Sequence, residues 1–121
     1  NYSAVTAAAL VVRKSIYMEV GGLDEKNLAV AFNDVDFCLR IQQAGYHNLY
    51  TPFAELYHHE SVSRGPRTDP KKAARFEKEA MYMKNNWSEM ISRDPCYSPN
   101  LSLNDGFKID ASRGKAWPWE A

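Results

Sequence analysis

The feature that most constrains the fold of this chain is an apolar run near its start, residues 4–12, in which Thr6 is the single polar side chain. Small and β-branched residues without polar alternation are typical of a strand that is buried on both faces. Such a strand needs partners on its edges and cover on its faces, so the run predicts a central strand. No cap or turn precedes the run and the chain does not begin with Met, so we expect it to continue a larger protein.

The rest of the chain alternates predicted helices with short strands. A brief helix is expected over residues 15–20, with Ser15 as its cap and Gly21-Gly22 as its end. A longer helix is expected over residues 33–44 and ends at Gly45, because its apolar residues recur every three or four positions. Residues 46–51 and 54–58 read as two strands separated by Pro52. Asp69-Pro70 is typical of a helix start and predicts a second long helix over residues 70–84. A short helical piece over residues 87–91 and an irregular tail are expected after it.

The composition excludes several classes of function. Fifteen basic side chains balance fifteen acidic ones, so no net charge favours nucleic acid or an anionic membrane. Cys38 and Cys96 lack CxxC spacing, which argues against a disulfide framework or a zinc site and fits a reducing compartment. No apolar stretch approaches the roughly 20 residues that span a bilayer. We therefore expect no nucleic-acid partner, no transmembrane segment in this chain, and a cytoplasmic location, with peripheral attachment to the inner face of the bacterial membrane as an option.

Two acidic residues at the start of the 33–44 helix are the first candidate site. Asp34 has two compatible interpretations: a helix cap that accepts backbone N–H groups, or a general base that projects from a rigid element into a cleft. Asp36 has Arg40 four residues later, so a helical ion pair explains it without chemistry. We therefore rank Asp36 as a supporting residue.

A second polar cluster, Tyr57-His58-His59-Glu60-Ser61, follows the expected strands. Adjacent histidines on a strand point to opposite faces, so only one of them serves a given site, and a structural role is an open alternative for either. Ser63 and Arg64 offer a hydroxyl and a forked cation suited to a diphosphate, although surface loops commonly carry such residues.

Four motifs in order resemble family 2 inverting glycosyltransferases of the GT-A fold, over residues 3–103. They are Gly-Gly-Leu-Asp-Glu, Asn-Asp-Val-Asp-Phe-Cys-Leu-Arg, Ala-Gly-Tyr and Tyr-His-His-Glu-Ser, and they are similar to those of enzymes that build O-antigen or rhamnan-type bacterial surface polysaccharides. The resemblance implies an α/β fold, the C-terminal, acceptor-side part of a GT-A (nucleotide-diphospho-sugar transferase) domain. That part would have a short mixed sheet, flanking helices and an irregular tail over residues 104–121.

The resemblance also implies site roles. Asp34 would be the base that deprotonates the acceptor hydroxyl, and Asn33 stands where the family more often has an acidic residue. The cleft for the acceptor and the donor sugar would be lined by Gly21, Gly22, Asp24, Asn33 and Asp36. His58, with His59 as the fallback, would bind a divalent metal (Mn or Mg) whose Asp-x-Asp ligands lie outside this chain, and Arg64 with Ser63 would hold the diphosphate.

The expected partners are a nucleotide-diphosphate sugar, a glycan or lipid-linked acceptor, and a missing N-terminal half of the same enzyme. Residues 1–121 alone are therefore expected to show little activity. Two rival hypotheses remain. One is a carbohydrate-binding module with exposed aromatic residues, namely Tyr46, Tyr50, Tyr57, Trp87, Trp117 and Trp119. The other is a metal-dependent hydrolase using His58, His59 and Asp34, for which His47 is badly placed as a third histidine.

Overall fold

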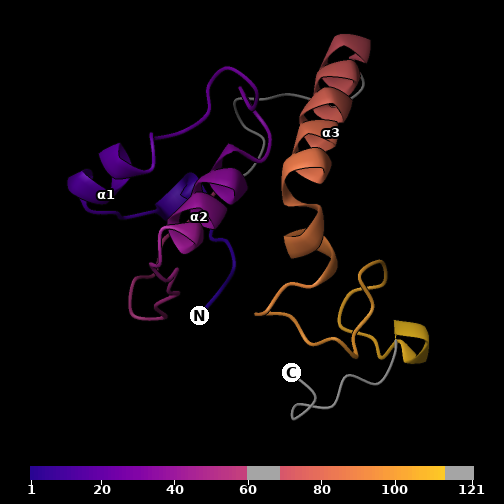
Figure 1. The fold of residues 1–121 in the computed structure, drawn as a ribbon. Coiled ribbons are helices and arrows are strands. Elements are labelled where there is room, and N and C mark those ends of the chain that lie inside the picture. The colour runs from indigo at the N-terminus through magenta and orange to yellow at the C-terminus, as the bar shows by residue number, and fades with distance from the viewer. Residues whose placement is uncertain (60–68, 114–121) are drawn as a thin grey trace.

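The computed structural model describes residues 1–59 and 69–113. The described elements are η1 (Ala7–Ala9), α1 (Lys14–Glu19), α2 (Asn33–Gln43), α3 (Pro70–Ser92) and η2 (Ala111–Arg113), where η denotes a 3-10 helix. Helices α1 and α2 lie on one side of the molecule and α3 runs alongside them (Figure 1). The predicted diphosphate residues Ser63 and Arg64 lie outside the described residues.

The three predicted strands are not formed in the described part of the chain. Residues 4–12 contain η1 instead, and Val11 is 99% exposed. Residues 46–51 contribute a single bridge, between Asn48 and Tyr2, and another isolated bridge joins Leu101 to Ile109. Because a buried strand needs hydrogen-bonded neighbours, apolar character alone does not make a sheet. The expected short mixed sheet is thus absent from the described residues, and the GT-A assignment stays a prediction.

The first two helices form where the sequence predicts them. The N-cap of α1 is Arg13, which makes no side-chain cap bond, so the prediction of Ser15 as the cap was wrong. Gly21 and Gly22 end α1 with φ values of 83° and 69°, a conformation that side chains with a Cβ rarely adopt. The N-cap of α2 is Phe32, which has a left-handed φ of 62°.

Helix α3 is longer than predicted and kinked. Asp69 caps it by accepting the Lys71 N–H, and Pro70 follows as the first helical residue, as the sequence indicates. The break expected after residue 84 is a kink at Trp87, which has φ −126° and ψ 23°. The side chain of the preceding residue, Asn86, donates to the Tyr82 carbonyl one turn back at 2.8 Å, and such local bonds compete with the helical ladder.

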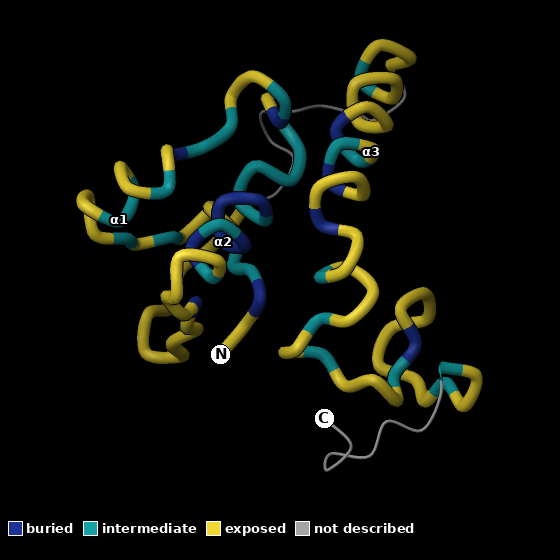
Figure 2. Tube along the Cα trace, in the orientation of Figure 1, coloured by how far each residue is buried: buried dark blue, intermediate teal, exposed yellow. Residues whose placement is uncertain are grey.

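The core lies between α2, the preceding loop and α3. Its buried members are Leu28, Leu39, Met83 and Trp87. Figure 2 shows buried residues on α2 and on the side of α3 nearest to it. Cys38 is buried and Cys96 exposed, and both are free thiols, as expected from their spacing. Among the described helices, none has the length and apolar character needed to cross a bilayer.

Candidate functional site

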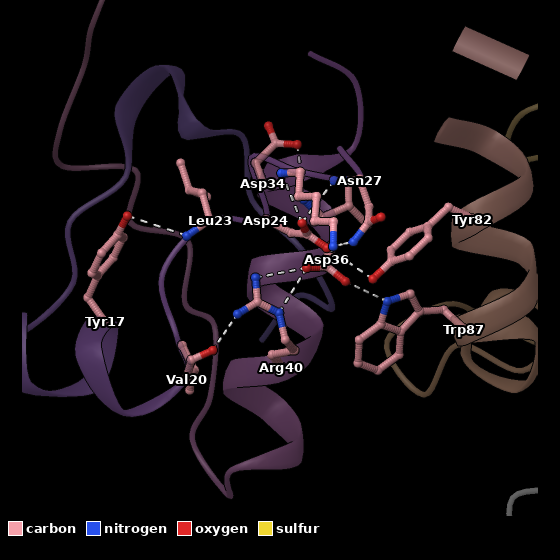
Figure 3. Close-up of polar contacts among 12 residues, drawn as sticks. Tyr17, Val20, Leu23, Asp24, Asn27, Asp34, Asp36, Arg40, Tyr82 and Trp87 are labelled. Carbon is pink, nitrogen blue, oxygen red and sulfur yellow. Dashed lines mark hydrogen bonds and ion pairs between the residues drawn. The ribbon is translucent and has the colours of Figure 1, made fainter. Parts of the chain in front are cut away.

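Asp36 is the centre of a buried polar network (Figure 3). The residue is 4% exposed. Its Oδ2 accepts a hydrogen bond from Arg40 Nε at 2.8 Å and lies 2.8 Å from Arg40 Nη2, and its Oδ1 accepts from Trp87 Nε1 at 2.9 Å. Burying a carboxylate is unfavourable unless it is paired and hydrogen-bonded, and here both oxygens are engaged. The ion pair predicted from the i, i+4 spacing is therefore confirmed.

Arg40 connects the Asp36 network to the end of α1. Its Nη1 donates to the Val20 carbonyl, directly before the Gly21-Gly22 stop. The same guanidinium lies 5.8 Å from the centre of the Phe37 ring. Arg40 thereby fixes the loop that follows α1 relative to the first turns of α2.

Asp24 organises the loop between α1 and α2. Its Oδ1 accepts the Lys26 and Asn27 backbone N–H groups at 3.2 and 3.0 Å, and its Oδ2 accepts from Asn27 Nδ2 at 2.9 Å and from the Tyr82 hydroxyl at 3.0 Å. These bonds, the Asn27 side chain foremost, hold the pKa of Asp24 below its ordinary value. The bond to Asp24 in turn raises the pKa of Tyr82. Residues 25–27 form a turn, and Tyr82 of α3 bonds to the Asp24 side chain that holds it.

A polar hollow of about 500 Å³ opens between this loop, α2 and α3. Its lining residues are Gly21, Leu23, Asp24, Glu25, Lys26, Asp36, Arg40 and Tyr82. Three residues of the predicted cleft therefore share one hollow: Gly21, Asp24 and Asp36. Gly22 is buried, and the space beside it is filled by Tyr17, whose ring would lie 2.8 Å from an added Cβ. Asn33 does not line the hollow.

Asp34 lies apart from this hollow. Two residues along an α-helix are separated by about 200° of rotation, so Asp34 and Asp36 project from nearly opposite sides of α2. Asp34 Oδ2 accepts the N–H of Ala7, the first residue of η1, at 3.1 Å, and Oδ1 accepts the Val35 N–H at 2.9 Å. Asp34 is thus no N-cap of its own helix, since Phe32 holds that position. It is a half-buried carboxylate that anchors the residue 4–12 segment.

The two histidines of the predicted metal site, His58 and His59, lie at the protein surface. His58 and His59 are both exposed, and neither forms a hydrogen bond or ion pair with any described residue. Within residues 1–59 and 69–113, no three His, Cys, Asp or Glu side chains come close enough together to hold a metal ion. The described residues therefore do not form a metal site on their own.

Sequence reasoning missed the contribution of α3 to this site. Tyr82 and Trp87 bond Asp24 and Asp36 across 58 and 51 residues of sequence. Trp87 was a candidate for an exposed stacking platform, but it is only 6% exposed and belongs to the core. The available signal was the apolar periodicity of α3, which predicts that one face packs but not which polar groups it meets.

Comparisons with known proteins give partial matches. The chain is 56% identical over 103 residues to uncharacterized protein y4gI of Sinorhizobium fredii and 33% identical over 103 residues to O-antigen biosynthesis protein RfbC of Myxococcus xanthus. Each match covers 85% of this chain. It is also 38% identical over 61 residues, 50% of the chain, to an N-acetylglucosaminyl-diphospho-decaprenol L-rhamnosyltransferase of Mycobacterium tuberculosis.

These matches cover only a small part of each relative. The chain spans 11% of the Sinorhizobium protein, 8% of the Myxococcus protein and 20% of the Mycobacterium enzyme. No family model matches the chain, and no solved structure matches it significantly. The similarity is therefore to a segment of each relative, of which one is uncharacterized, one is named an O-antigen biosynthesis protein and one is named an L-rhamnosyltransferase.

Proposed function

We propose that this chain is part of a glycosyltransferase that acts in the synthesis of a bacterial surface polysaccharide. The observation that carries the proposal is the similarity to a named L-rhamnosyltransferase and to a named O-antigen biosynthesis protein. We further propose that the reaction follows the inverting, family 2 type, with a nucleotide-diphosphate sugar as donor and a glycan or lipid-linked acceptor.

Asp34 is the proposed base, and its surroundings favour it over Asp36. A carboxylate has about four acceptor positions, and the described bonds to Asp34 occupy two of them, from Ala7 and Val35. The remaining positions are available to an acceptor hydroxyl. Asp36 lines the hollow, but it is 4% exposed and bonded at both oxygens, so it could take a proton from a substrate only by giving up a bond to Arg40 or Trp87.

The proposed step is a single in-line displacement. Asp34 takes the proton of the acceptor hydroxyl while the acceptor oxygen bonds to the anomeric carbon of the donor sugar. The bond between that carbon and the diphosphate oxygen breaks, and the nucleoside diphosphate leaves with the electron pair. Attack from the opposite face inverts the configuration at this carbon.

The polar hollow is the proposed place for a sugar unit of the acceptor away from the reacting hydroxyl, because Asp34 projects from nearly the opposite side of α2. Carboxylates, a guanidinium and the Tyr82 hydroxyl line it, and such groups suit a ligand rich in hydroxyls. Its glycine, Gly21, contributes no side chain to the lining.

The remaining assignments are proposals of the same kind. A divalent metal (Mn or Mg) would need ligands from outside this chain, and His58 would supply one at most. Ser63 and Arg64 would contact the diphosphate. The described residues do not assemble a metal site by themselves.

The test is a transfer assay with the complete gene product. It would be incubated with Mn²⁺ or Mg²⁺, a polyprenyl-diphosphate-linked N-acetylglucosamine acceptor, and a panel of nucleotide sugars that includes dTDP-L-rhamnose. We expect release of nucleoside diphosphate with at least one donor and, by NMR, a product with inverted anomeric configuration. Failure of every donor, together with glycan binding by calorimetry, would favour the binding-module alternative, for which Tyr50 and Tyr57 are exposed.

A further inference from the structure

We propose that α3 is a clamp that positions Asp34, and that Trp87 and Glu79 are its positioning residues. The inference rests on the proposed function, in which Asp34 is the base. Neither residue forms a hydrogen bond with Asp34, whose described bonds are to Ala7 and Val35. Each acts on the backbone or the helix that carries it.

The first arm of the clamp is Trp87. Its indole N–H donates to Asp36 Oδ1 at 2.9 Å, and both residues are buried. The kink of α3 falls at this residue, whose backbone leaves helical geometry. A buried hydrogen bond to a charged acceptor is directional and strong, so it fixes the rotation of the first turns of α2 about the helix axis. That rotation decides where Asp34 points.

The second arm is Glu79. It is 2% exposed, and its Oε2 accepts the Ala31 N–H at 2.7 Å. The next residue, Phe32, is the left-handed N-cap of α2, and its ring packs on Phe76 of α3 at a centroid distance of 5.2 Å. Strained backbone of this kind persists only where its surroundings hold it. Glu79 and Phe76 hold it from the same helix, two residues before Asp34.

The two arms grip α2 at its entry and within its first two turns. On the other side of the first turn of α2, the Asp34 side chain is bonded to the Ala7 N–H. Figure 3 shows the Trp87 and Tyr82 side chains of α3 pointing toward Asp36 and Asp24, while Asp34 lies at the top of the labelled group. Removing one arm should therefore loosen Asp34 without unfolding the core.

The test compares four variants of the complete gene product. Trp87→Phe removes the indole donor, and Met83→Ala removes packing from the same core cluster without touching a polar tie. Glu79→Ala removes the second arm, and Glu77→Ala is its exposed control on the same helix. We expect Trp87→Phe and Glu79→Ala to lower kcat about ten- to a hundredfold, as a misplaced catalytic group does, with donor KM unchanged. Met83→Ala should lose stability but keep its kcat at temperatures where it is folded.

A second readout does not depend on activity. Hydrogen exchange of the backbone amides at the start of α2 should accelerate in Trp87→Phe and Glu79→Ala, while those of α1 stay unchanged. The clamp is overturned if this exchange is unaltered, or if kcat falls in Trp87→Phe only in proportion to the loss of stability seen in Met83→Ala. If the wild-type protein transfers no sugar, the proposed function fails, and the exchange data still decide whether the clamp exists.

Discussion

Phe32 offers a direct test of how the entry of α2 is built, because two substitutions there differ only in backbone freedom. Phe32→Ala and Phe32→Gly both remove the ring and its contact with Phe76. Glycine adopts the observed φ of 62° without steric cost, whereas alanine does not. The difference between the two variants therefore isolates the left-handed conformation.

The expected magnitude comes from two opposing effects. A left-handed residue with a Cβ costs about 1–2 kcal/mol relative to its preferred conformation. Glycine loses about 0.5–1 kcal/mol more conformational entropy on folding than alanine does. The net difference is about 0.5–1 kcal/mol in favour of Phe32→Gly, which corresponds to a two- to fivefold smaller opening constant for the first turn of α2, at about 1.4 kcal/mol per factor of ten.

Hydrogen exchange of the Asp36 amide measures this opening, since its N–H donates to the Phe32 carbonyl at 2.9 Å and makes the first bond of the helix. We expect faster exchange in both variants than in the wild type and the fastest exchange in Phe32→Ala. Equal exchange in the two variants, or slower exchange in Phe32→Ala, would refute the account of a strained N-cap.

Two further predictions concern the loop before α2 and the helix ends. Gly22→Ala should lower the free energy of unfolding by about 2–3 kcal/mol, because the new Cβ would lie 2.8 Å from the Tyr17 ring. Gly45→Ala, at φ 86° in open space, should lower it by about 1 kcal/mol. Urea denaturation measures both free energies, and equal losses would contradict the packing argument. The pKa of Asp24 is lowered in the folded protein, so its stabilisation is present above its ordinary pKa of about 4 and is lost as pH falls through the lowered value. The destabilisation caused by Asp24→Asn should therefore be largest at neutral pH and shrink below about pH 4, and a pH-independent difference would show that the carboxylate charge is not what the Asn27 bonds stabilise.

The helices and some of their ends could be predicted from the sequence because their determinants are local. Gly21-Gly22 ends α1, Asp69-Pro70 starts α3, and the Asp36–Arg40 pair follows from helical spacing. The strand prediction for residues 4–12 was wrong because the pattern reports the apolar character of the residues, not whether hydrogen-bonding partners are present. In the described chain the one ladder contact of this region is the Tyr2–Asn48 bridge.

The site was predicted in composition but not in arrangement. Gly21, Asp24 and Asp36 do line one hollow, yet their nearest polar partners include Tyr82 and Trp87, more than 50 residues away in sequence. No short-range sequence pattern predicts a hydrogen bond between residues so far apart in the chain. The separation of Asp34 from the hollow follows from helix geometry, and it could have been anticipated once the 33–44 helix was accepted.

The central claim is that Asp34 is the reacting carboxylate, and the Asp34→Asn variant of the complete gene product tests it most directly. The matched control is Asp105→Asn, whose carboxylate is exposed and, within the part of the chain that the structure describes, pairs with Lys108 alone. We predict that the initial rate of nucleoside diphosphate release falls about a hundred- to ten-thousandfold in Asp34→Asn, with unchanged circular dichroism, and stays at the wild-type value in Asp105→Asn. Transfer by a folded Asp34→Asn protein at the wild-type rate would contradict the account.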